Sequence, residues 1–142
     1  MDVLYTAEAQ ATGGRDGRVT SSDGQIDLAL VPPKEVGGPG GDGTNPEQLF
    51  AAGYGACFLS ALKFAAAPHK LRTSQFTIDT LVSLERDDSG FFIAAELHGN
   101  LPDVDEQLAR ELMHTAHQGC PYSKATRGNI EVKLFLGDQP LD

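Results

Sequence analysis

The sequence is short of basic side chains. Its 142 residues contain 11 lysines and arginines against 20 aspartates and glutamates, so the formal net charge is −9. Binding the phosphates of a nucleic acid, or the head groups of an anionic membrane, requires clustered lysine and arginine. The charge balance therefore argues against nucleic acid and against an anionic membrane as partners.

Cysteine is also scarce, since only Cys57 and Cys120 occur. A chain of this length buries roughly two-thirds of the surface that its unfolded form exposes, so it needs no disulfide framework to fold. With 40% apolar and 22% charged residues, the composition is that of an ordinary globular protein. The two thiols are therefore inert fillers, metal ligands or a redox pair.

Long, strongly apolar runs are missing as well. The most apolar stretch, residues 51–67, contains Lys63 and many small residues. We expect it to fall short of the ~20 strongly apolar residues that a membrane span needs. Residues 1–5 show no signal peptide, because no basic region leads into an apolar run. We expect a cytoplasmic protein with a single domain over residues 1–142. In that compartment a lone cysteine pair is more often catalytic, redox-active or free than structural.

The first third of the chain predicts two strands separated by turns. Apolar and polar residues alternate over residues 3–11 and again over residues 26–30, which favours strands. Between them, residues 13–18 are rich in glycine and hold Arg15, which indicates a turn. Residues 36–43 contain five glycines and predict an irregular loop.

The first helix is well signalled at its start. Asn45 is a favourable N-cap, Pro46 suits the first helical position, and Gln48 stands where a capping box requires it. The helix is expected to end near Ala67, before Pro68. Its residues are apolar on nearly every side, which predicts a buried helix, and its small residues permit close packing within the chain or across a subunit interface.

The second half of the sequence predicts a hairpin, a helix and a strand. Residues 76–84 and 91–97 alternate around a turn, which is typical of a hairpin. Asp103 and Glu106 form a second expected capping box, and Gly119 is expected to end that helix. A strand over residues 130–134 completes an α+β fold with antiparallel pairing. The expected core stripe of this helix is Leu108, Leu112, Met113 and Ala116.

Cys57 has two interpretations from its position alone. A free cysteine in an apolar helix often behaves as a small buried hydrophobe. A reactive thiol needs access and a nearby cation, which a position within a helix does not supply. Arg15 is the leading candidate for that cation, and Arg18 is its rival. The alternative for each arginine is that it lies in a turn, exposed to solvent, and has no role at the thiol.

Glu47 raises a geometric question. A carboxylate in the first turn of a helix is favoured by the helix dipole alone. Glu47 precedes Cys57 by ten residues, about 15 Å along a straight helix, so the two side chains cannot touch within it. If they share one active site, either the helix begins after Glu47 or a second subunit contributes Glu47.

Two other kinds of site are weakly signalled or lacking. His114, His117 and Cys120 are spaced by three residues and could form a zinc site together with Cys57, but they lack the paired thiols typical of structural zinc. Residues 37–43 are not a phosphate-binding loop, because no Gly-Lys-Ser/Thr follows and Asp42 would repel phosphate.

Several motifs follow one another along almost the whole chain. They are Gly13–Gly17 (GGRDG), Gly43–Tyr54 (GTNPEQLFAAGY) leading into Ala56–Phe58 (ACF), Cys120–Ser123 (CPYS) and Ala125–Asn129 (ATRGN). Together they resemble the organic hydroperoxide resistance proteins, one branch of the OsmC/Ohr superfamily. The other branch shares the two cysteines, but the glycine-rich approach to residues 45–48 is more similar to the hydroperoxide-resistance branch.

This resemblance implies a thiol peroxidase that reduces organic hydroperoxides, including those of fatty acids. It implies an OsmC-like, intertwined homodimer, with sheets packed on two main helices and the active sites at the subunit interface. Cys57 matches the peroxidatic cysteine and Cys120 the resolving one, while Arg15 and Glu47 match the pair that polarises the thiol and the peroxide. The resemblance points to recycling by a dihydrolipoyl group on a lipoylated protein, and no cofactor or metal is expected.

The position of four aromatic residues near these motifs suggests the apolar walls of a substrate pocket. An apolar wall favours an alkyl hydroperoxide over hydrogen peroxide. The alternatives are a zinc-binding or thiol redox-sensor protein without peroxidase turnover, and an inert α+β dimer. The expected pocket residues are Phe50, Tyr54, Phe58 and Tyr122.

Overall fold

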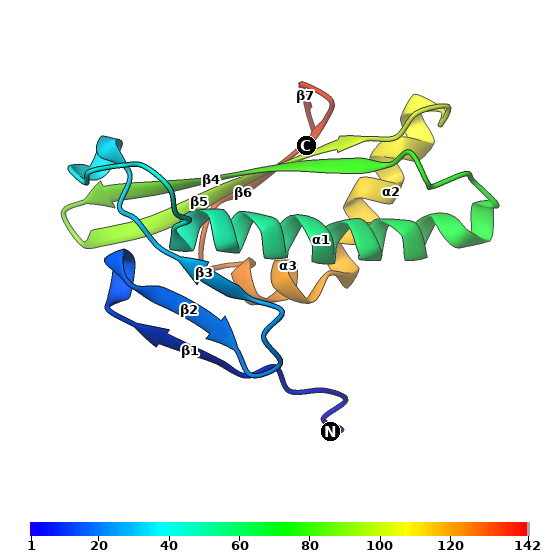
Figure 1. Cartoon of the computed structure of the whole chain (residues 1–142). Coiled ribbons are helices and arrows are strands. Elements are labelled where there is room, and N and C mark those ends of the chain that lie inside the picture. Colours follow the sequence, from blue (N-terminus) through cyan, green and yellow to red (C-terminus); the bar gives the residue numbers. More distant parts are fainter. Residues whose placement is uncertain (142) are drawn as a thin grey trace. The chain divides into compact units, whose positions relative to one another are not determined.

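The computed structural model describes residues 1–141, and the chain divides into two units, Met1–Leu49 and Phe50–Asp142. The first unit holds an antiparallel three-stranded sheet with the order β1-β2-β3 (Figure 1). A turn at Gly13 and Gly14, whose φ angles are 71° and 68°, connects the first two strands. Such left-handed angles favour glycine. The strands are β1 (Ala9–Thr12), β2 (Arg18–Ser21) and β3 (Asp27–Ala29).

The sequence located the strands of this sheet only in part. The expected strand over residues 3–11 is wrong for residues 3–8, since β1 begins at Ala9. β2 has four residues, and its pairs run from Ala9↔Ser21 to Thr12↔Arg18, so it offers no partner for residues before Ala9. β2 itself was not expected, because its sequence, RVTS, is too short and polar to show apolar alternation. The strand expected at residues 26–30 is confirmed as β3.

Two short 3₁₀ helices lie in the connections of this unit. η1 (Gly14–Asp16) carries Arg15, and η2 (Lys34–Val36) precedes the glycine-rich segment. The expected irregular loop is confirmed for residues 37–43, which form no helix or strand.

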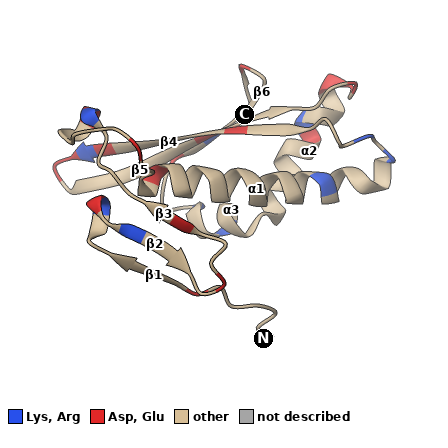
Figure 2. Ribbon diagram, viewed as in Figure 1, with Lys and Arg blue, Asp and Glu red and all other residues tan. Residues whose placement is uncertain are grey.

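The helix α1 (Pro46–Ala66) begins where the sequence predicts. The Asn45 side chain caps it by accepting a hydrogen bond of 2.9 Å from the backbone N–H of Gln48. The Gln48 side chain does not complete a capping box with Asn45; it accepts a hydrogen bond from the Thr44 hydroxyl instead. The helix ends one residue before Ala67, where η3 (Ala67–His69) accommodates Pro68. Figure 2 shows α1 almost free of charged side chains.

The expectation that α1 is buried on all sides is not met within one chain. Its buried side chains recur every four residues and form one stripe: Tyr54, Phe58, Leu62 and Ala66. Phe64, on another face, is 84% exposed. A second stripe of the helix, which includes Phe64, is therefore exposed in the single chain, and most of the residues between the two stripes are partly buried.

The apolar character of α1 also bears on the membrane question. Within residues 1–141, Pro46–His69 is the one helical stretch that is long and apolar enough to cross a membrane by length and composition. The prediction that the stretch falls short is therefore wrong by these two criteria. Core helices of globular proteins meet the same criteria, and α1 places a stripe of side chains in the core.

The second unit is built on a four-stranded sheet with the order β4-β5-β6-β7 (Figure 1). The expected hairpin is confirmed: β4 and β5 pair antiparallel over their whole length, from Thr77↔Asn100 to Asp87↔Gly90. The strands are β4 (Thr77–Asp87), β5 (Gly90–Asn100), β6 (Val132–Leu136) and β7 (Gln139–Pro140).

The expectation of purely antiparallel pairing is wrong for this sheet. β6 runs parallel to β5, with Leu97 opposite Leu134. Parallel neighbours need a long crossover connection, usually with a helix. Residues 101–131 contain two helices and bring the chain back to start β6 in the same direction as β5. The sheet is therefore mixed.

The crossover contains α2 (Glu106–Gly119) and α3 (Pro121–Thr126), separated by Cys120 alone. α2 ends at Gly119 as expected, but its N-cap is Asp105, whose carboxylate accepts a hydrogen bond from Leu108 N–H. The predicted cap, Asp103, instead adopts a φ of 64° two residues before the helix cap. α3 was not expected as a helix.

The core of the second unit lies where α1 and α2 meet the sheet. Its fully buried side chains come from α1, β5, α2 and the residue that follows α2, Cys120. Three of the four core residues expected on α2 are buried, while Leu108 is partly buried. Ala109 takes a buried place that the sequence assigned to Leu108. The largest apolar side chains that are fully buried are Tyr54, Phe58, Leu62, Leu97 and Met113.

Candidate active site

The two cysteines lie on neighbouring elements of the second unit. Cys57 is partly exposed on α1, and Cys120 has no exposed surface at the corner between α2 and α3. The corner forms because the residue before a proline disfavours helical angles, and Cys120 adopts an extended conformation before Pro121. Both thiols are free in the structure.

The Cys57 thiol is adjacent to Cys120. Burial has the largest effect and raises the pKa of the Cys57 thiol, and the side chain of Cys120 raises it further. The backbone N–H of Tyr122 acts in the opposite direction. The surroundings that the second unit provides therefore favour the neutral thiol over the thiolate.

Arg15 and Glu47 form an ion pair within the first unit. The guanidinium donates from Nη1 to Glu47 Oε2 at 2.9 Å and from Nη2 to Oε1 at 2.7 Å, so both carboxylate oxygens are engaged. The hydrogen bond from Arg15 is the main reason that the pKa of Glu47 is lowered. The same pairing raises the pKa of Arg15. A two-bond pair of this kind fixes the plane of the guanidinium.

Arg18, the rival cation, has a different partner. Its Nε donates to Asp27 Oδ1 at 2.6 Å, between β2 and β3, and both side chains are more than half exposed. Arg15 is therefore the arginine that pairs with the carboxylate at the start of α1, as the motif resemblance implies.

The helix α1 starts before Glu47, which settles one of two alternatives. The sequence allowed Glu47 and Cys57 to share a site if the helix began later than Pro46. The helix is continuous from Pro46 to Ala66, so that alternative is excluded.

The four expected pocket residues fall into two groups. Phe50 and Tyr122 line a cavity of about 530 Å³. Tyr54 and Phe58 have no exposed surface, so they do not line it directly. The ring of Tyr54 instead supports the two wall residues, with centroids 5.9 Å from Phe50 and 5.7 Å from Tyr122.

Sequence reasoning missed the other residues of this cavity. Pro121 and Asn129 stand within the quoted motifs, which was the available signal. Ile93 comes from β5, and nothing in the sequence placed it beside α3. The remaining lining is mostly apolar: Ile93, Pro121, Ala125, Thr126, Asn129 and Ile130.

The close approach of Tyr122 to α1 depends on Gly53. A Cβ at Gly53 would lie 2.7 Å from the Tyr122 hydroxyl oxygen. The missing side chain at this position therefore gives room to one wall of the cavity.

The two histidines of α2 are not arranged as metal ligands. His117 Nδ1 lies 2.8 Å from Ser123 Oγ, and burial is the main cause of the lowered pKa of its imidazole. Within residues 1–141, no group of three or more His, Cys, Asp or Glu side chains is placed to hold a metal ion. The zinc-site alternative therefore has no ligand cluster in the described structure.

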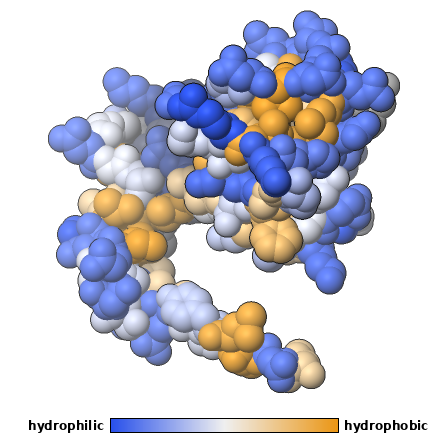
Figure 3. Space-filling view, turned by 90° about the vertical axis from the view of Figure 1, so that its right-hand side faces the viewer, coloured by the Kyte–Doolittle hydropathy of each residue, from blue (hydrophilic) through white to orange (hydrophobic). Residues whose placement is uncertain are grey.

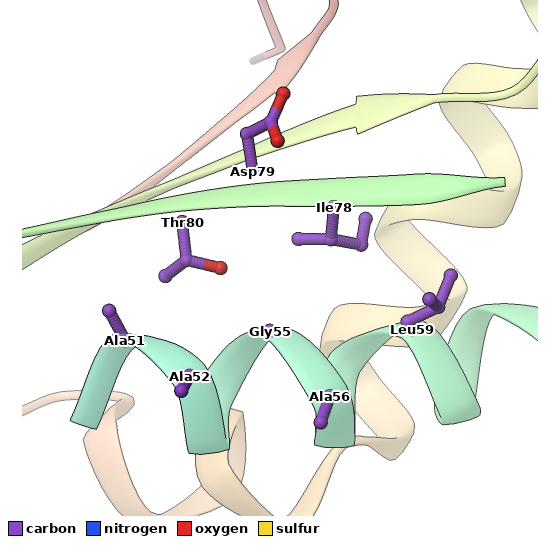
Figure 4. Close-up of a pocket in the computed structure, with 8 residues that line it drawn as sticks. All are labelled: Ala51, Ala52, Gly55, Ala56, Leu59, Ile78, Asp79 and Thr80. Atoms are coloured by element: carbon purple, nitrogen blue, oxygen red, sulfur yellow. The ribbon is translucent and has the colours of Figure 1, made fainter. Parts of the chain in front are cut away.

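A second hollow, of about 380 Å³, lies between α1 and β4. Figure 4 shows Thr80 and Ile78 directed toward the helix and Asp79 directed away from it. The Thr80 hydroxyl has no hydrogen-bond partner within residues 1–141, although its oxygen is buried. Gly55 faces it, and a Cβ there would lie 2.8 Å from that oxygen. Neither thiol lines this hollow.

Comparison with known proteins defines the class first. The OsmC-like protein family matches residues 38–135. The chain is 54% identical over 135 residues to the organic hydroperoxide resistance protein of Xanthomonas axonopodis pv. citri, covering 94% of this chain and 95% of the relative. It is 49% identical to the organic hydroperoxide resistance protein OhrB of Bacillus subtilis, covering 94% and 98%.

The fold agrees with these sequence relatives. The crystal structure of Bacillus subtilis OhrB matches with a TM-score of 0.85 at 48% identity, over 94% of this chain and 99% of that one. The chain therefore belongs to the OsmC/Ohr family, among its organic hydroperoxide resistance proteins.

Proposed function

We propose that this protein is a cysteine-based peroxidase that reduces organic hydroperoxides to alcohols. The observation that carries the proposal is the contact between the partly exposed Cys57 and the buried Cys120 in a chain of this family. A thiol that reacts with peroxide needs access, and a second thiol beside it prevents overoxidation.

The chemistry assigns one step to each cysteine. The Cys57 thiol first loses its proton, and the thiolate attacks the distal oxygen of ROOH. The O–O bond breaks, and the products are a Cys57 sulfenic acid and an alkoxide, which takes up one proton to leave as ROH. The Cys120 sulfur then attacks the sulfur of the sulfenic acid. The S–O bond breaks, water leaves with the proton of the Cys120 thiol, and an intramolecular disulfide forms. An external dithiol restores both thiols by exchange.

Arg15 and Glu47 are proposed to activate the first step. Within the second unit the pKa of Cys57 is raised, so a reactive thiolate requires a cation from elsewhere. Arg15 supplies the charge for the thiolate and for the developing alkoxide, and Glu47 holds its guanidinium in one plane. Because α1 is continuous from Pro46, we assign this pair to a site completed by a second subunit.

The cavity beside α3 is proposed to bind the organic part of the substrate. Phe50 and Tyr122 form part of its wall, and Tyr54 and Phe58 support that wall from the core. Neither cysteine lines the cavity, but its residue Tyr122 places a backbone N–H beside the Cys57 thiol. Burying an alkyl chain there favours alkyl and fatty-acid hydroperoxides over hydrogen peroxide.

The exposed face of α1 supports the proposed homodimer. Ala52, Ala56, Ser60 and Phe64 recur every four residues and are exposed in the single chain. Figure 3 shows hydrophobic residues at the molecular surface, without identifying the elements that carry them. A solvent-facing apolar helix surface is typical of a contact with another chain. A solution mass of one chain, measured by light scattering, would contradict the dimer.

Several finer assignments rest on the family resemblance. We propose that residues 1–142 act as one OsmC/Ohr-like domain in the cytoplasm, in defence against oxidative stress. The proposed reductant is a dihydrolipoyl group on a lipoylated protein, and no bound cofactor takes part in the proposed steps.

A peroxide-consumption assay tests the function. The purified chain is given tert-butyl hydroperoxide or hydrogen peroxide, with dihydrolipoamide as reductant. We expect turnover when a peroxide and dihydrolipoamide are both present. We expect a higher kcat/KM for tert-butyl hydroperoxide than for hydrogen peroxide. The alternative without turnover, a thiol sensor, predicts a single oxidation with no sustained consumption.

A further inference from the structure

A chain of buried polar side chains connects the corner of Cys120 to α1. Tyr54 Oη lies 2.8 Å from Ser123 Oγ and 3.1 Å from Thr126 Oγ1. Ser123 Oγ also lies 2.8 Å from His117 Nδ1. Tyr54 and Ser123 have no exposed surface, and Thr126 is 6% exposed. Because water cannot replace these contacts, each buried hydroxyl depends on the others for its hydrogen bonds.

The number of protons available fixes which group donates in each of these hydrogen bonds. The Thr126 hydroxyl donates to the backbone carbonyl of Ser123, so it must accept from Tyr54. Tyr54 has then used its proton and accepts from Ser123. Ser123 in turn accepts from Nδ1–H of His117. A hydroxyl has one proton to donate, so the imidazole must be the donor that starts the chain.

Burial and the charge of Arg127 lower the pKa of His117, which favours the neutral imidazole. The neutral ring has one N–H proton, and the direction of the hydrogen bonds assigns it to Nδ1. The guanidinium of Arg127 also donates to the backbone carbonyl of His117, which adds a second bond across the corner.

Two members of this hydrogen-bond network are each three residues from one of the cysteines. Ser123 follows Cys120 by three residues at the corner, and Cys57 follows Tyr54 by three residues on α1. Residues three apart on a helix share a face, so the Tyr54–Ser123 bond lies about one turn from the contact of the two sulfurs. His117 precedes Cys120 by three residues, so its bond to Ser123 closes the corner around the buried thiol.

We propose that His117, Ser123, Tyr54 and Thr126 are positioning residues that hold the Cys120 sulfur in line with the Cys57 sulfenic acid for disulfide formation. The inference rests on the proposed function, and it concerns only the second step. That step needs the attacking sulfur on the axis of the breaking S–O bond, so a small displacement of the corner lowers its rate without removing a reactive group.

Matched substitutions at His117 test the donor. In His117→Asn the amide nitrogen can stand near the position of Nδ1, whereas in His117→Gln it reaches the position of Nε2 instead. We expect the ratio of the disulfide-forming rate to the sulfenic-acid-forming rate to fall about tenfold in His117→Gln. We expect His117→Asn to stay within about twofold of the wild type. If the imidazole only fills space, the ratio of the two rates should fall equally in both variants.

The two rates are separated by rapid mixing with tert-butyl hydroperoxide, acid quenching and intact-mass analysis. Sulfenic acid adds one oxygen to the mass, and the disulfide removes two hydrogens. Tyr54→Phe keeps the ring and removes the central hydroxyl, and it should give the same loss of about tenfold. It decides the question by itself if a His117 variant does not fold, as judged by circular dichroism.

The outcomes distinguish the inference from the function beneath it. If the wild type forms no disulfide with the peroxide, the proposed function fails. If the wild type forms it and both His117→Gln and Tyr54→Phe keep the wild-type ratio, the positioning role is overturned and the function stands.

Discussion

The ion pair of the first unit and the thiol pair of the second differ in what surrounds them. Arg15 is 45% exposed on the side chain and binds Glu47 through two hydrogen bonds. Cys57 lies against buried Cys120, and burial raises the pKa of its thiol. The first unit therefore holds a pair of charged side chains. The second unit holds two thiols, and its surroundings favour the neutral form of Cys57. The comparison teaches what the proposed mechanism requires of each region, because the thiol supplies the nucleophile and a cation must stabilise its thiolate.

The largest effect is expected from removing the reactive sulfur. Cys57→Ser should lower peroxide turnover by on the order of 10⁴-fold or more, as the loss of a nucleophile does. The oxygen is much less nucleophilic than a thiolate, although the side chain is similar in size. Measurable turnover of tert-butyl hydroperoxide in this variant would remove Cys57 from the mechanism and with it the contrast between the two regions.

Cys120→Ser should have the next largest effect on peroxide turnover, because it removes the second thiol and leaves Cys57 in place. The variant should consume about one peroxide per site and then stop, leaving Cys57 open to further oxidation. Intact-mass analysis should show added oxygens. The oxidised wild type should instead lose two hydrogens, and two free thiols after oxidation would contradict a redox pair.

Arg15→Ala tests whether the ion pair acts on the thiol. We expect the rate of Cys57 oxidation at neutral pH to fall about 10²-fold, as when one electrostatic donor is removed. The cation favours the thiolate, so its loss should raise the pKa of Cys57 and shift the pH–rate curve to higher pH.

Arg18→Ala is the control for this prediction, because Arg18 pairs with Asp27 instead of Glu47. Its pH–rate curve should match that of the wild type. An unchanged curve in Arg15→Ala together with a shifted one in Arg18→Ala would reverse the assignment.

Glu47→Gln should have the smallest effect, on stability. The folded chain lowers the pKa of Glu47, chiefly through Arg15. A carboxyl of this kind stabilises the folded state above its unfolded pKa, near 4.3, and the contribution is lost as pH falls through the folded value. Because Arg15 is nearly half exposed, we expect a loss below about 1 kcal/mol at pH 7. Urea unfolding should show that this difference shrinks as the pH falls below the unfolded pKa, near 4.3.

The sequence predicted best the elements whose signals are local. The Asn45 cap, the end of α2 at Gly119 and the β4–β5 hairpin each follow from residues within one turn or one strand, and all three are present. β2 was missed because it is short and polar, and α3 because it is only six residues long. The parallel pairing of β6 was missed because its partner, β5, is distant in sequence.

The candidate site was predictable to a similar degree. The resemblance of the motifs to the organic hydroperoxide resistance proteins indicated Arg15, Glu47 and both cysteines, and the structure shows the contacts within each pair. Local sequence could not show that Tyr54 is enclosed while Phe50 lines a cavity, because both are aromatic residues of the same helix. The His117–Ser123 bond was also invisible, since it depends on the turn at Cys120.

The parallel pairing of β5 with β6 has a consequence for how the chain reaches its fold. β5 ends at Asn100, and its parallel neighbour begins only at Val132, so the two strands cannot pair until the intervening helices have closed a long loop. Closing such a loop costs conformational entropy before the strand pairing stabilises the fold, and this slows folding. During synthesis β6 leaves the ribosome only after β5 and both helices of the crossover. Until then, β5 offers an unpaired edge to other chains, and this is the stage at which we expect aggregation to compete with folding.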